Sequence, residues 1–217
     1  VSEPRKVAEA VDATGLDYVV LTMVNRDDLE DEGAQHVAAC IGAIKRRTPQ
    51  VFVEALIGDF SGRNRLVDVV CDAAPDVLGH NIETVERLQT VVRDRRSGFK
   101  CSLGVLSRAK AHHLKPHTKS SIMLGLGERD DEIIATMKAL RQHGVDFLTL
   151  GQYLQPTPEH LPVQKYVHPT TFDGHREKGE ALGFHYVASG PLVRSSYRAG
   201  EHFIRASIES RRPDANE

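Results

Sequence analysis

The feature of this sequence that most restricts its fold is a regular alternation of short apolar runs with longer amphipathic segments. Six apolar runs have the length and composition of buried strands: 17–24, 51–56, 76–81, 118–126, 146–154 and 184–189. Strands that alternate with helices along a chain form parallel sheets with right-handed crossovers. With six or seven such strands and no doubly wound glycine fingerprint, the sequence predicts an α/β fold, a full or partial (β/α) barrel with parallel strands.

Helical periodicity fills the intervals between these runs. The expected helices are 4–14, 34–48, 64–74, 82–94, 129–143, 170–181 and 199–211. A less regular segment is expected to form a strand at 99–103 and then a helix. Since each helix of a βα series follows a strand, a chain that opens on a helix is expected to lack its first βα unit. We expect a partial barrel domain at 1–198, then a C-terminal helix and polar tail at 199–217.

The composition argues against several classes of protein. The formal net charge of −2 disfavours bulk binding to nucleic acid or to an anionic membrane, and no stretch approaches the roughly 20 apolar residues of a membrane span. The N-terminus lacks the apolar core of a signal peptide. The three cysteines form no C-x-x-C pair, so neither a zinc site nor a disulfide framework is expected. Cys40 and Cys71 fall on apolar helical faces, which predicts buried, unreactive thiols in a reducing, cytoplasmic setting.

Polar side chains recur near the ends of the expected strands. In parallel barrels the functional face lies at the carboxyl ends of the strands. The residues concerned are Asn25, Arg26, Asp27, Asp28, Glu54, Asp59, His80, Asn81 and Glu83, with Lys119 at the start of a strand and the segments 125–128 and 151–163 after two others. Any one of them could cap a helix or lie in a solvated loop, as Asn81 could before 82–94. Their recurrence on one face favours a ligand site.

Two further patterns are weaker. The GLGE stretch at 125–128 does not complete a phosphate-binding loop, although glycines at a strand end let a ligand such as an adenine or amino-acid group approach the backbone. The eleven histidines show no metal-ligand spacing. Most of them, including His112, His113 and His117, are expected at the surface.

Long stretches of the chain follow one another in the order and spacing of a known family. They are GLDYVVLTMVNRDDLEDEGAQH (15–36), VEALIGDFSG (53–62), PDVLGHNIETVERL (75–88), TKSSIMLGLGE (118–128), GQYLQPTPEHLPVQKYV (151–167) and ALGFHYVASGPLVRSSYRAG (181–200). On these residues the chain resembles the lipoyl synthases, which are radical S-adenosylmethionine enzymes. The last two stretches are specific to that family.

The resemblance implies an activity that depends on cofactors. Lipoyl synthases insert two sulfur atoms into a protein-bound octanoyl-lysine. One [4Fe-4S] cluster cleaves S-adenosylmethionine to a deoxyadenosyl radical, and an auxiliary [4Fe-4S] cluster gives up its sulfide. The implied partners are octanoylated lipoyl-domain proteins (2-oxoacid dehydrogenase E2 subunits and the glycine cleavage H protein) and an electron donor such as ferredoxin or flavodoxin. The implied compartment is the cytoplasm, or the mitochondrion or plastid of a eukaryote.

The resemblance also implies roles for particular residues. Asn81 and Glu83 would hold the ribose or methionine part of S-adenosylmethionine, and Lys119 would pair with its carboxylate. The adenosyl side would be lined by Gly125, Gly127 and Glu128. The segment 151–163 would lie close to the octanoyl-lysine pocket.

The stretch RSSY at 194–197 is the C-terminal signature of the resembled family. Its second serine, Ser196, would be a hydroxyl ligand of the auxiliary cluster, and Arg194 would contact the cofactor. A serine oxygen is a more labile ligand than a thiolate. It could therefore leave as the cluster gives up its sulfur.

The cysteines depart from the family pattern. The family carries C-x4-C-x5-C and C-x3-C-x2-C triplets in its N-terminal part, and neither occurs here. Because a cluster needs several thiolates, one serine cannot hold it. We expect a truncated chain that alone binds no cluster and makes no lipoyl groups. Smaller departures, which concern loop shape, are Asn25, Glu32, Gly58 and Arg129 in place of the usual Asp, Gly, Pro and Thr.

Two other interpretations stay open at this point. The chain could be a non-catalytic pseudoenzyme that binds S-adenosylmethionine or the octanoylated lipoyl domain. It could also be another (β/α) barrel enzyme with a nucleotide-like ligand, for which the matches at 151–156 and 194–197 would be coincidental.

Overall fold

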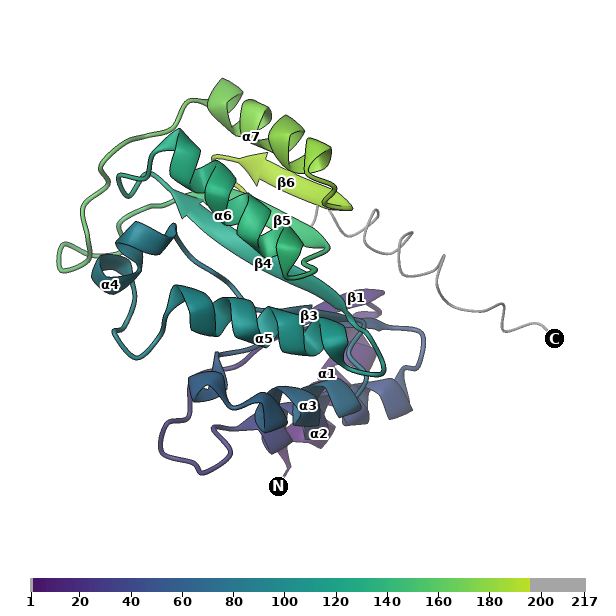
Figure 1. Ribbon diagram of the computed structural model, residues 1–217. Coiled ribbons are helices and arrows are strands. Elements are labelled where there is room, and N and C mark those ends of the chain that lie inside the picture. Colours follow the sequence, from purple (N-terminus) through teal and green to yellow (C-terminus); the bar gives the residue numbers. More distant parts are fainter. Residues whose placement is uncertain (1, 196–217) are drawn as a thin grey trace.

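The computed structural model describes residues 2–195, which form one layer of parallel strands with helices packed against it (Figure 1). The strands are β1 (Tyr18–Thr22), β2 (Phe52–Leu56), β3 (Val77–Gly79), β4 (His117–Leu124), β5 (Phe147–Gln152) and β6 (Tyr186–Gly190). They pair in sequence order, and every pair is parallel. Within the described residues β1 pairs only with β2 and β6 only with β5, so the sheet is not closed. The expected partial (β/α) barrel is confirmed.

Helices connect the strands as the alternation predicts. The longer ones are α1 (Glu3–Thr14), α2 (Ala34–Arg47), α3 (Asn64–Asp72), α5 (Phe99–Ala111), α6 (Asp130–Gln142) and α7 (Pro169–Ala181). Three short ones are η1 (Phe60–Gly62), η2 (Glu86–Leu88) and α4 (Gln89–Val92). The helix expected at 199–211 and the tail lie outside the described residues, and the domain division at 198 stays a prediction.

Two predictions of secondary structure are wrong, both between β3 and β4. A single helix was predicted over 82–94, but Glu83 instead bridges to Ile122 of β4, and only η2 and α4 follow. The Gln89 side chain donates to the carbonyls of Ile82 and Thr84, so it satisfies these acceptors without a helix. The strand predicted at 99–103 is the start of α5, because the buried positions Leu103 and Leu106 continue a helical period.

Apolar side chains pack between the helices and the sheet in two large clusters. Ile44 of α2 packs with Val53 of β2 in one cluster, and Met137 of α6 packs with Leu148 of β5 in the other. Figure 1 shows α6 lying along β4 and β5, with α7 beside β6. Burial of these side chains stabilises the sheet by roughly 1.5–3 kcal/mol for each large residue. The packed sheet therefore supports the loops at the carboxyl ends of its strands.

At the amino ends of the strands, two equivalent ion pairs tie a helix to the sheet. Lys45 of α2 contacts Asp76 before β3. Lys110 of α5 donates to both carboxylate oxygens of Asp146 before β5, at 2.8 and 2.6 Å. Each carboxylate also accepts a backbone N–H from the preceding strand. Among the described residues, no helix combines the length and the apolar character that a membrane crossing requires.

Candidate functional site

Two adjacent cavities open at the carboxyl ends of the strands, and Asn81 and Glu83 line both of them. One cavity, of about 200 Å³, lies over the ends of β1, β2 and β3. The other, of about 250 Å³, lies over the ends of β4 and β5. The two residues follow β3 and so stand between the cavities. The structure therefore brings together two of the residues that the sequence predicts at a ligand site.

Hydrogen bonds to β4 hold the segment 81–83 in place. The Ile82 N–H donates to Ser120 Oγ at 3.1 Å, and the Glu83 N–H donates to the Ser121 carbonyl at 3.0 Å. The Met123 N–H donates to the Glu83 carbonyl at 2.8 Å. These bonds fix Glu83 at a φ of 66°, a left-handed conformation that costs a non-glycine residue of order 1–3 kcal/mol. Strain of this kind at the wall of a cavity is typical of a functional site.

The Glu83 carboxyl is set in a poorly solvated environment. Burial raises its pKa above the ordinary value, and a hydrogen bond from the Asn81 side chain acts in the opposite direction. A partly desolvated carboxyl beside an amide can accept hydrogen bonds from hydroxyl or ammonium groups of a ligand. Perturbed carboxyls in a cleft are frequent at functional sites.

His80 anchors the start of this segment through a chain of hydrogen bonds. Its Nδ1 lies 2.9 Å from the Ile57 carbonyl, so Nδ1 donates and the neutral ring accepts at Nε2 from Ser102 Oγ, also at 2.9 Å. Arg93 Nη1 donates to the same Ser102 Oγ at 2.7 Å. Burial lowers the pKa of His80 to about 4, which keeps the ring neutral. His80 thus fixes the loop that carries Asn81.

The segment after β6 crosses the second cavity. Val193 is buried, and its N–H donates to the Gly190 carbonyl at 3.1 Å. A Cβ atom on Gly151 would lie 2.2 Å from the Val193 carbonyl oxygen, so only glycine permits this close passage. Arg194 and Ser195 then line the cavity. Ser196, expected from the resemblance as a cluster ligand, lies outside the described residues.

Lys119 does not line either cavity. Its Nζ donates to both carboxylate oxygens of Glu54, at 2.9 and 2.8 Å, and the Tyr18 hydroxyl donates to the same carboxylate at 2.6 Å. All three side chains are buried. A buried and fully paired ammonium needs no ligand carboxylate to satisfy it. The role expected for Lys119 stays a prediction that this geometry does not support.

The glycine turn after β4 also lies apart from the two cavities. Glu128 closes the turn, because its carboxylate accepts the N–H groups of Gly125 and Leu126. Gly125 has a φ of 106°, and a Cβ there would meet the Lys165 carbonyl at 2.5 Å. Gly127 has a φ of 100°. The turn is thus built for contact with the segment 164–167, and its expected role beside the adenosyl group stays a prediction.

The departures from the family pattern are explained in part by local contacts. A Cβ on Gly58 would lie 2.6 Å from Asn25 Oδ1, so the residues at these two positions are complementary. Glu32 has a φ of 46°, where glycine is usual, and its carboxylate accepts from Ser61 Oγ at 2.8 Å and pairs with Arg63. The ion pair offsets part of the cost of the left-handed backbone.

The cysteines offer no cluster site among the described residues. Cys40 lies in α2, Cys71 in α3 and Cys101 in α5, and all three are free. Burial raises the pKa of each thiol, that of Cys71 to about 12, whereas a cluster is bound by thiolates. No group of potential metal-binding side chains in residues 2–195 includes a cysteine. The chain's described residues therefore do not fit a [4Fe-4S] cluster, and the predicted burial of Cys40 and Cys71 is confirmed.

The prediction of surface histidines is wrong for two of the three named. His112 and His117 are buried, whereas His113 is exposed. His112 packs against His113 with a ring separation of 4.3 Å, and His117 stacks on Phe147 at 5.1 Å. Isolated histidines carry no periodic signal, so the sequence did not reveal their burial.

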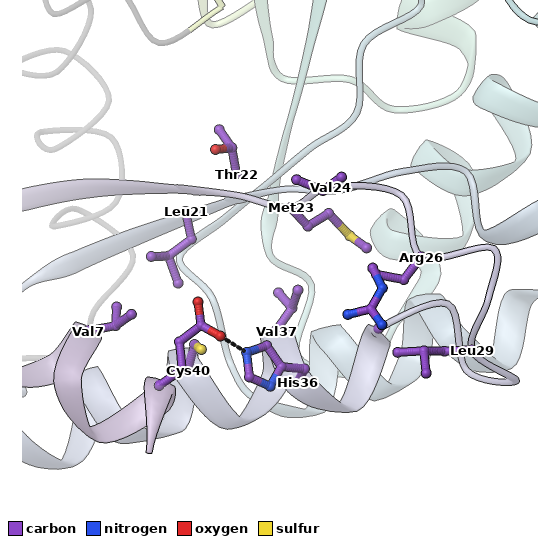
Figure 2. A pocket seen from close by; sticks show the side chains of 12 residues that line it. Val7, Leu21, Thr22, Met23, Val24, Arg26, Leu29, His36, Val37 and Cys40 are labelled. Atoms are coloured by element: carbon purple, nitrogen blue, oxygen red, sulfur yellow. Dashed lines mark hydrogen bonds and ion pairs between the residues drawn. The ribbon is translucent and has the colours of Figure 1, made fainter. Parts of the chain in front are cut away.

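A third cavity, of about 400 Å³, lies at the edge of the sheet between β1, α1 and α2 (Figure 2). Figure 2 shows Leu21 extending from β1 toward the two helices, with Val37 below it. An ion pair between His36 and Glu3, 3.0 Å long, stands at its side. Most of the lining is apolar, and its ionisable side chains are already paired, Glu3 with His36 and Arg26 with Asp28. This cavity is therefore not the candidate site.

Several residues of the candidate site were missed by the sequence reasoning. They are Ser121, Met123, Val193 and Ser195 in the second cavity, and Arg93 and Ser97 in the first, whereas Gly151 and Gln152 belong to the predicted segment 151–163. The strand residues among them lie inside apolar runs, where alternation marks two faces without showing which faces a ligand. Gly151 carried a detectable signal, because a glycine inside a strand indicates close approach of another backbone.

The sequence of this chain is similar to a known protein family and to known proteins. The model of the radical SAM superfamily matches residues 1–140. Lipoyl synthase, mitochondrial, of Schizosaccharomyces pombe is 54% identical over 212 residues, which cover 97% of this chain and 57% of that protein. The protein of the same name from Drosophila melanogaster is 52% identical over 217 residues, which cover 100% of this chain and 58% of that protein. The chain thus spans less than two thirds of the length of these curated relatives.

Two solved structures share the arrangement of strands and helices. Methylornithine synthase superimposes with a TM-score of 0.60 over 76% of this chain and 47% of that one, at 14% identity. The FeFe-hydrogenase maturase HydG from Carboxydothermus hydrogenoformans gives the same TM-score and identity over 95% of this chain and 58% of that one. At this identity the likeness concerns the fold alone.

Proposed function

This chain belongs to the radical SAM superfamily. We propose that it is part of a lipoyl synthase, an enzyme that inserts two sulfur atoms into a protein-bound octanoyl-lysine. The observation that carries the proposal is the pair of cavities that share Asn81 and Glu83 at the carboxyl ends of the strands. Identity of 52–54% with proteins named lipoyl synthase, over nearly the whole chain, supports this member of the superfamily. S-adenosylmethionine is the cofactor that we assign to the cavities.

The donors and acceptors around the cavities suit S-adenosylmethionine. The partly buried Glu83 carboxyl would accept hydrogen bonds from the ribose hydroxyls or from the ammonium group, and the Asn81 amide could donate or accept beside it. Arg194, which lines the same cavity, would supply a positive charge for the ligand carboxylate. When bound and reduced by one electron, with methionine as the leaving group, this cofactor would supply the hydrogen-atom abstraction that the reaction needs. The protein's contribution is to hold it in a fixed orientation and to exclude water.

The second cavity also offers an apolar wall for an acyl chain. Met123, Leu154 and Pro156 line it next to the polar residues. Leu154 begins the proline-rich loop that leaves β5, and the Tyr153 hydroxyl holds this loop by donating to the Leu161 carbonyl at 2.8 Å. We assign this wall to the octanoyl group of an octanoylated lipoyl-domain protein, such as an E2 subunit or the H protein.

The iron–sulfur chemistry cannot be assigned to the described residues, since their cysteines do not fit a cluster. We therefore propose lipoyl synthesis as the activity of the whole protein, with two [4Fe-4S] clusters and an electron donor such as ferredoxin or flavodoxin. The relatives compared above are named as mitochondrial proteins. For this chain we propose a reducing compartment, the cytoplasm or a eukaryotic organelle, because its described cysteines are free.

The test is sulfur insertion by the whole protein after anaerobic reconstitution with iron and sulfide. An octanoylated lipoyl-domain protein is the substrate, and mass spectrometry measures the gain of two sulfur atoms. We expect Asn81→Ala to lower the rate at limiting S-adenosylmethionine, with Asn64→Ala, an exposed residue that lines neither cavity, as the matched control. Sulfur insertion that is equally fast in both variants would overturn the assignment of the site.

A non-catalytic binding module is the second candidate, and the unsuitable cysteines favour it. Both candidates use the same cavities, but they differ in iron content. A whole protein that binds S-adenosylmethionine but retains no iron after reconstitution, and inserts no sulfur, would support the binding module over the enzyme.

A further inference from the structure

A cluster of His117, Asp146 and His185 lies at the amino ends of three adjacent strands, opposite the candidate functional site. His117 begins β4, Asp146 directly precedes β5, and His185 directly precedes β6. The parallel pairing of these strands brings the three residues together although they are far apart in sequence. One ligand atom from each lies within 4.8 Å of the other two. The set contains the two imidazoles and one carboxylate that transition metals favour.

His117 is the member that indicates a missing ligand. The residue is 4% exposed, and within residues 2–195 neither ring nitrogen has a hydrogen-bond partner. One face of the ring stacks on Phe147 at 5.1 Å, and its edge meets His185 with the ring centroids 6.2 Å apart. Buried polar atoms are nearly always paired in folded proteins, so an imidazole of this kind needs an explanation. A metal ion bound to one nitrogen provides it.

The distances also suit a shared ion. His117 Nδ1 lies 3.5 Å from one oxygen of Asp146, and His185 Nδ1 lies 3.8 Å from the other. These separations are long for hydrogen bonds. They are close to the spacing of about 3.3 Å between two ligands of one tetrahedral zinc ion, which follows from metal–ligand distances of about 2.0–2.1 Å. A small contraction of the side chains would complete the geometry.

Asp146 already has hydrogen-bond partners in this structure. Lys110 donates to both of its carboxylate oxygens, at 2.8 and 2.6 Å, and the Thr118 N–H donates to Oδ2 at 3.0 Å. Lys110 is the more exposed partner of the pair, with 28% of its side chain accessible. It can therefore keep one carboxylate oxygen while a metal ion takes the other.

We propose that His117, Asp146 and His185 bind a divalent transition metal ion such as zinc, with water at the fourth position. The ion would join β4, β5 and β6 at the edge of the sheet opposite the cavities. Its role would be structural, because three strands that meet at one ion cannot separate without losing it.

A second group of similar composition is a poorer candidate. Asp72, His112 and His113 also come within ligand distance of one another. His112 Nε2 already contacts Asp72 at 3.1 Å, and His112 Nδ1 accepts the Leu114 N–H at 3.3 Å. Both nitrogens of its buried ring are thus satisfied, and the other two side chains are exposed. This group supplies the control for the test.

The test is titration of the metal-free protein with Co²⁺ alone, followed by visible absorption. We expect saturable d–d bands without a sulfur-to-cobalt charge-transfer band. His185→Ala should weaken Co²⁺ binding by at least about tenfold. Replacing a residue that only hydrogen-bonds to a metal ligand already costs about that much affinity, and loss of a ligand should cost no less. His113→Ala, which changes an exposed histidine of the other group, should bind like the wild-type protein.

Thermal unfolding provides the second readout. Zn²⁺ should raise the unfolding midpoint of the wild-type protein and of His113→Ala, and should raise that of His185→Ala much less. His185 is partly exposed, so its replacement leaves the core intact. Equal Co²⁺ affinity in wild type and His185→Ala, or loss of binding in His113→Ala, would overturn the proposal. Sulfur-to-cobalt bands at saturation would assign the ion to the cysteines and would also overturn it.

Discussion

The carbonyl oxygen of Val193 lies 2.2 Å from the position that a Cβ atom on Gly151 would occupy. This close approach lets the segment 190–195 cross the carboxyl end of β5 and brings Arg194 and Ser195 to the wall of the second cavity. Because Gly151 has no side chain, the segment 190–195 can pass close to β5 and reach the site.

Replacement of this glycine should displace the crossing segment. Because the atom in the way belongs to the backbone, Gly151→Ala should destabilise the fold by roughly 1–3 kcal/mol, as overpacking does. Gly174→Ala is the control, since no atom of the described chain lies within 4 Å of its Cβ position in α7, and alanine there should stabilise by roughly 0.5–1 kcal/mol. Urea unfolding measures both. Equal stability of Gly151→Ala and wild type would show that the segment 190–195 does not pass as described.

His80 should make the stability depend on pH. Burial lowers its pKa to about 4 from 6.5, so between these values the unfolded chain binds a proton that the folded chain does not. The free energy of unfolding should therefore fall as the pH is lowered from 6.5 to 4, with a limiting slope of about 1.4 kcal/mol per pH unit from this residue. His80→Asn, whose amide can still donate to the Ile57 carbonyl, should reduce the slope. An unchanged slope in this variant would contradict the account.

The ion pair of Lys110 and Asp146 should contribute strongly to stability. Removal of one partner leaves a buried charge unpaired, so Lys110→Met should cost about 3–5 kcal/mol at neutral pH. Arg96→Met, which breaks ion pairs with the exposed Asp27 and Asp94, should change the stability far less, because exposed pairs are screened by solvent. Urea unfolding of both variants tests the contrast.

The effect of Lys110→Met should also depend on pH. The folded pKa of Asp146 lies below the unfolded value of about 3.9. The pair's contribution is therefore complete above the unfolded pKa and is lost as the pH falls below about 4. A difference between wild type and Lys110→Met that stays constant through this range would show that another interaction is responsible.

Asn25 and Gly58 should behave as a coupled pair. A Cβ at position 58 would lie 2.6 Å from Asn25 Oδ1, so Gly58→Ala should destabilise the protein. Asn25→Ala should relieve the clash, and a double-mutant cycle should yield a coupling energy of about 0.5–3 kcal/mol. Additive effects of the two substitutions would place these side chains apart.

Much of the fold could be predicted from the sequence, because apolar runs and helical periods report directly on burial. The alternation of apolar runs with helical segments predicted the strands between Tyr18 and Gly190 in their order along the chain. The secondary structure of residues 82–103 was predicted wrongly for a physical reason. Side chains such as Gln89 satisfy backbone carbonyls there, and this hydrogen bonding leaves no periodic pattern in the sequence.

The candidate site could be predicted only in part. Asn81 and Glu83 follow a strand, so their position at the carboxyl edge was expected and lies where predicted. Lys119 was also expected to bind a ligand carboxylate, because its side chain is cationic. In the structure its ammonium group instead donates to the carboxylate of the buried Glu54. A single sequence does not reveal such pairing across strands, since the two residues are separated by 65 positions.

The most direct test of the central claim is calorimetric titration of the chain with S-adenosylmethionine. We predict one saturable site, weakened about 10-fold to 100-fold by Asn81→Ala and by Glu83→Gln, because each removes a hydrogen bond to a charged or polar ligand group worth about 1.5–3 kcal/mol. Asn64→Ala should bind like the wild-type chain, and circular dichroism should confirm that each variant is folded. Wild-type affinity in both Asn81→Ala and Glu83→Gln would contradict the assignment of the cofactor to the cavities that these residues share.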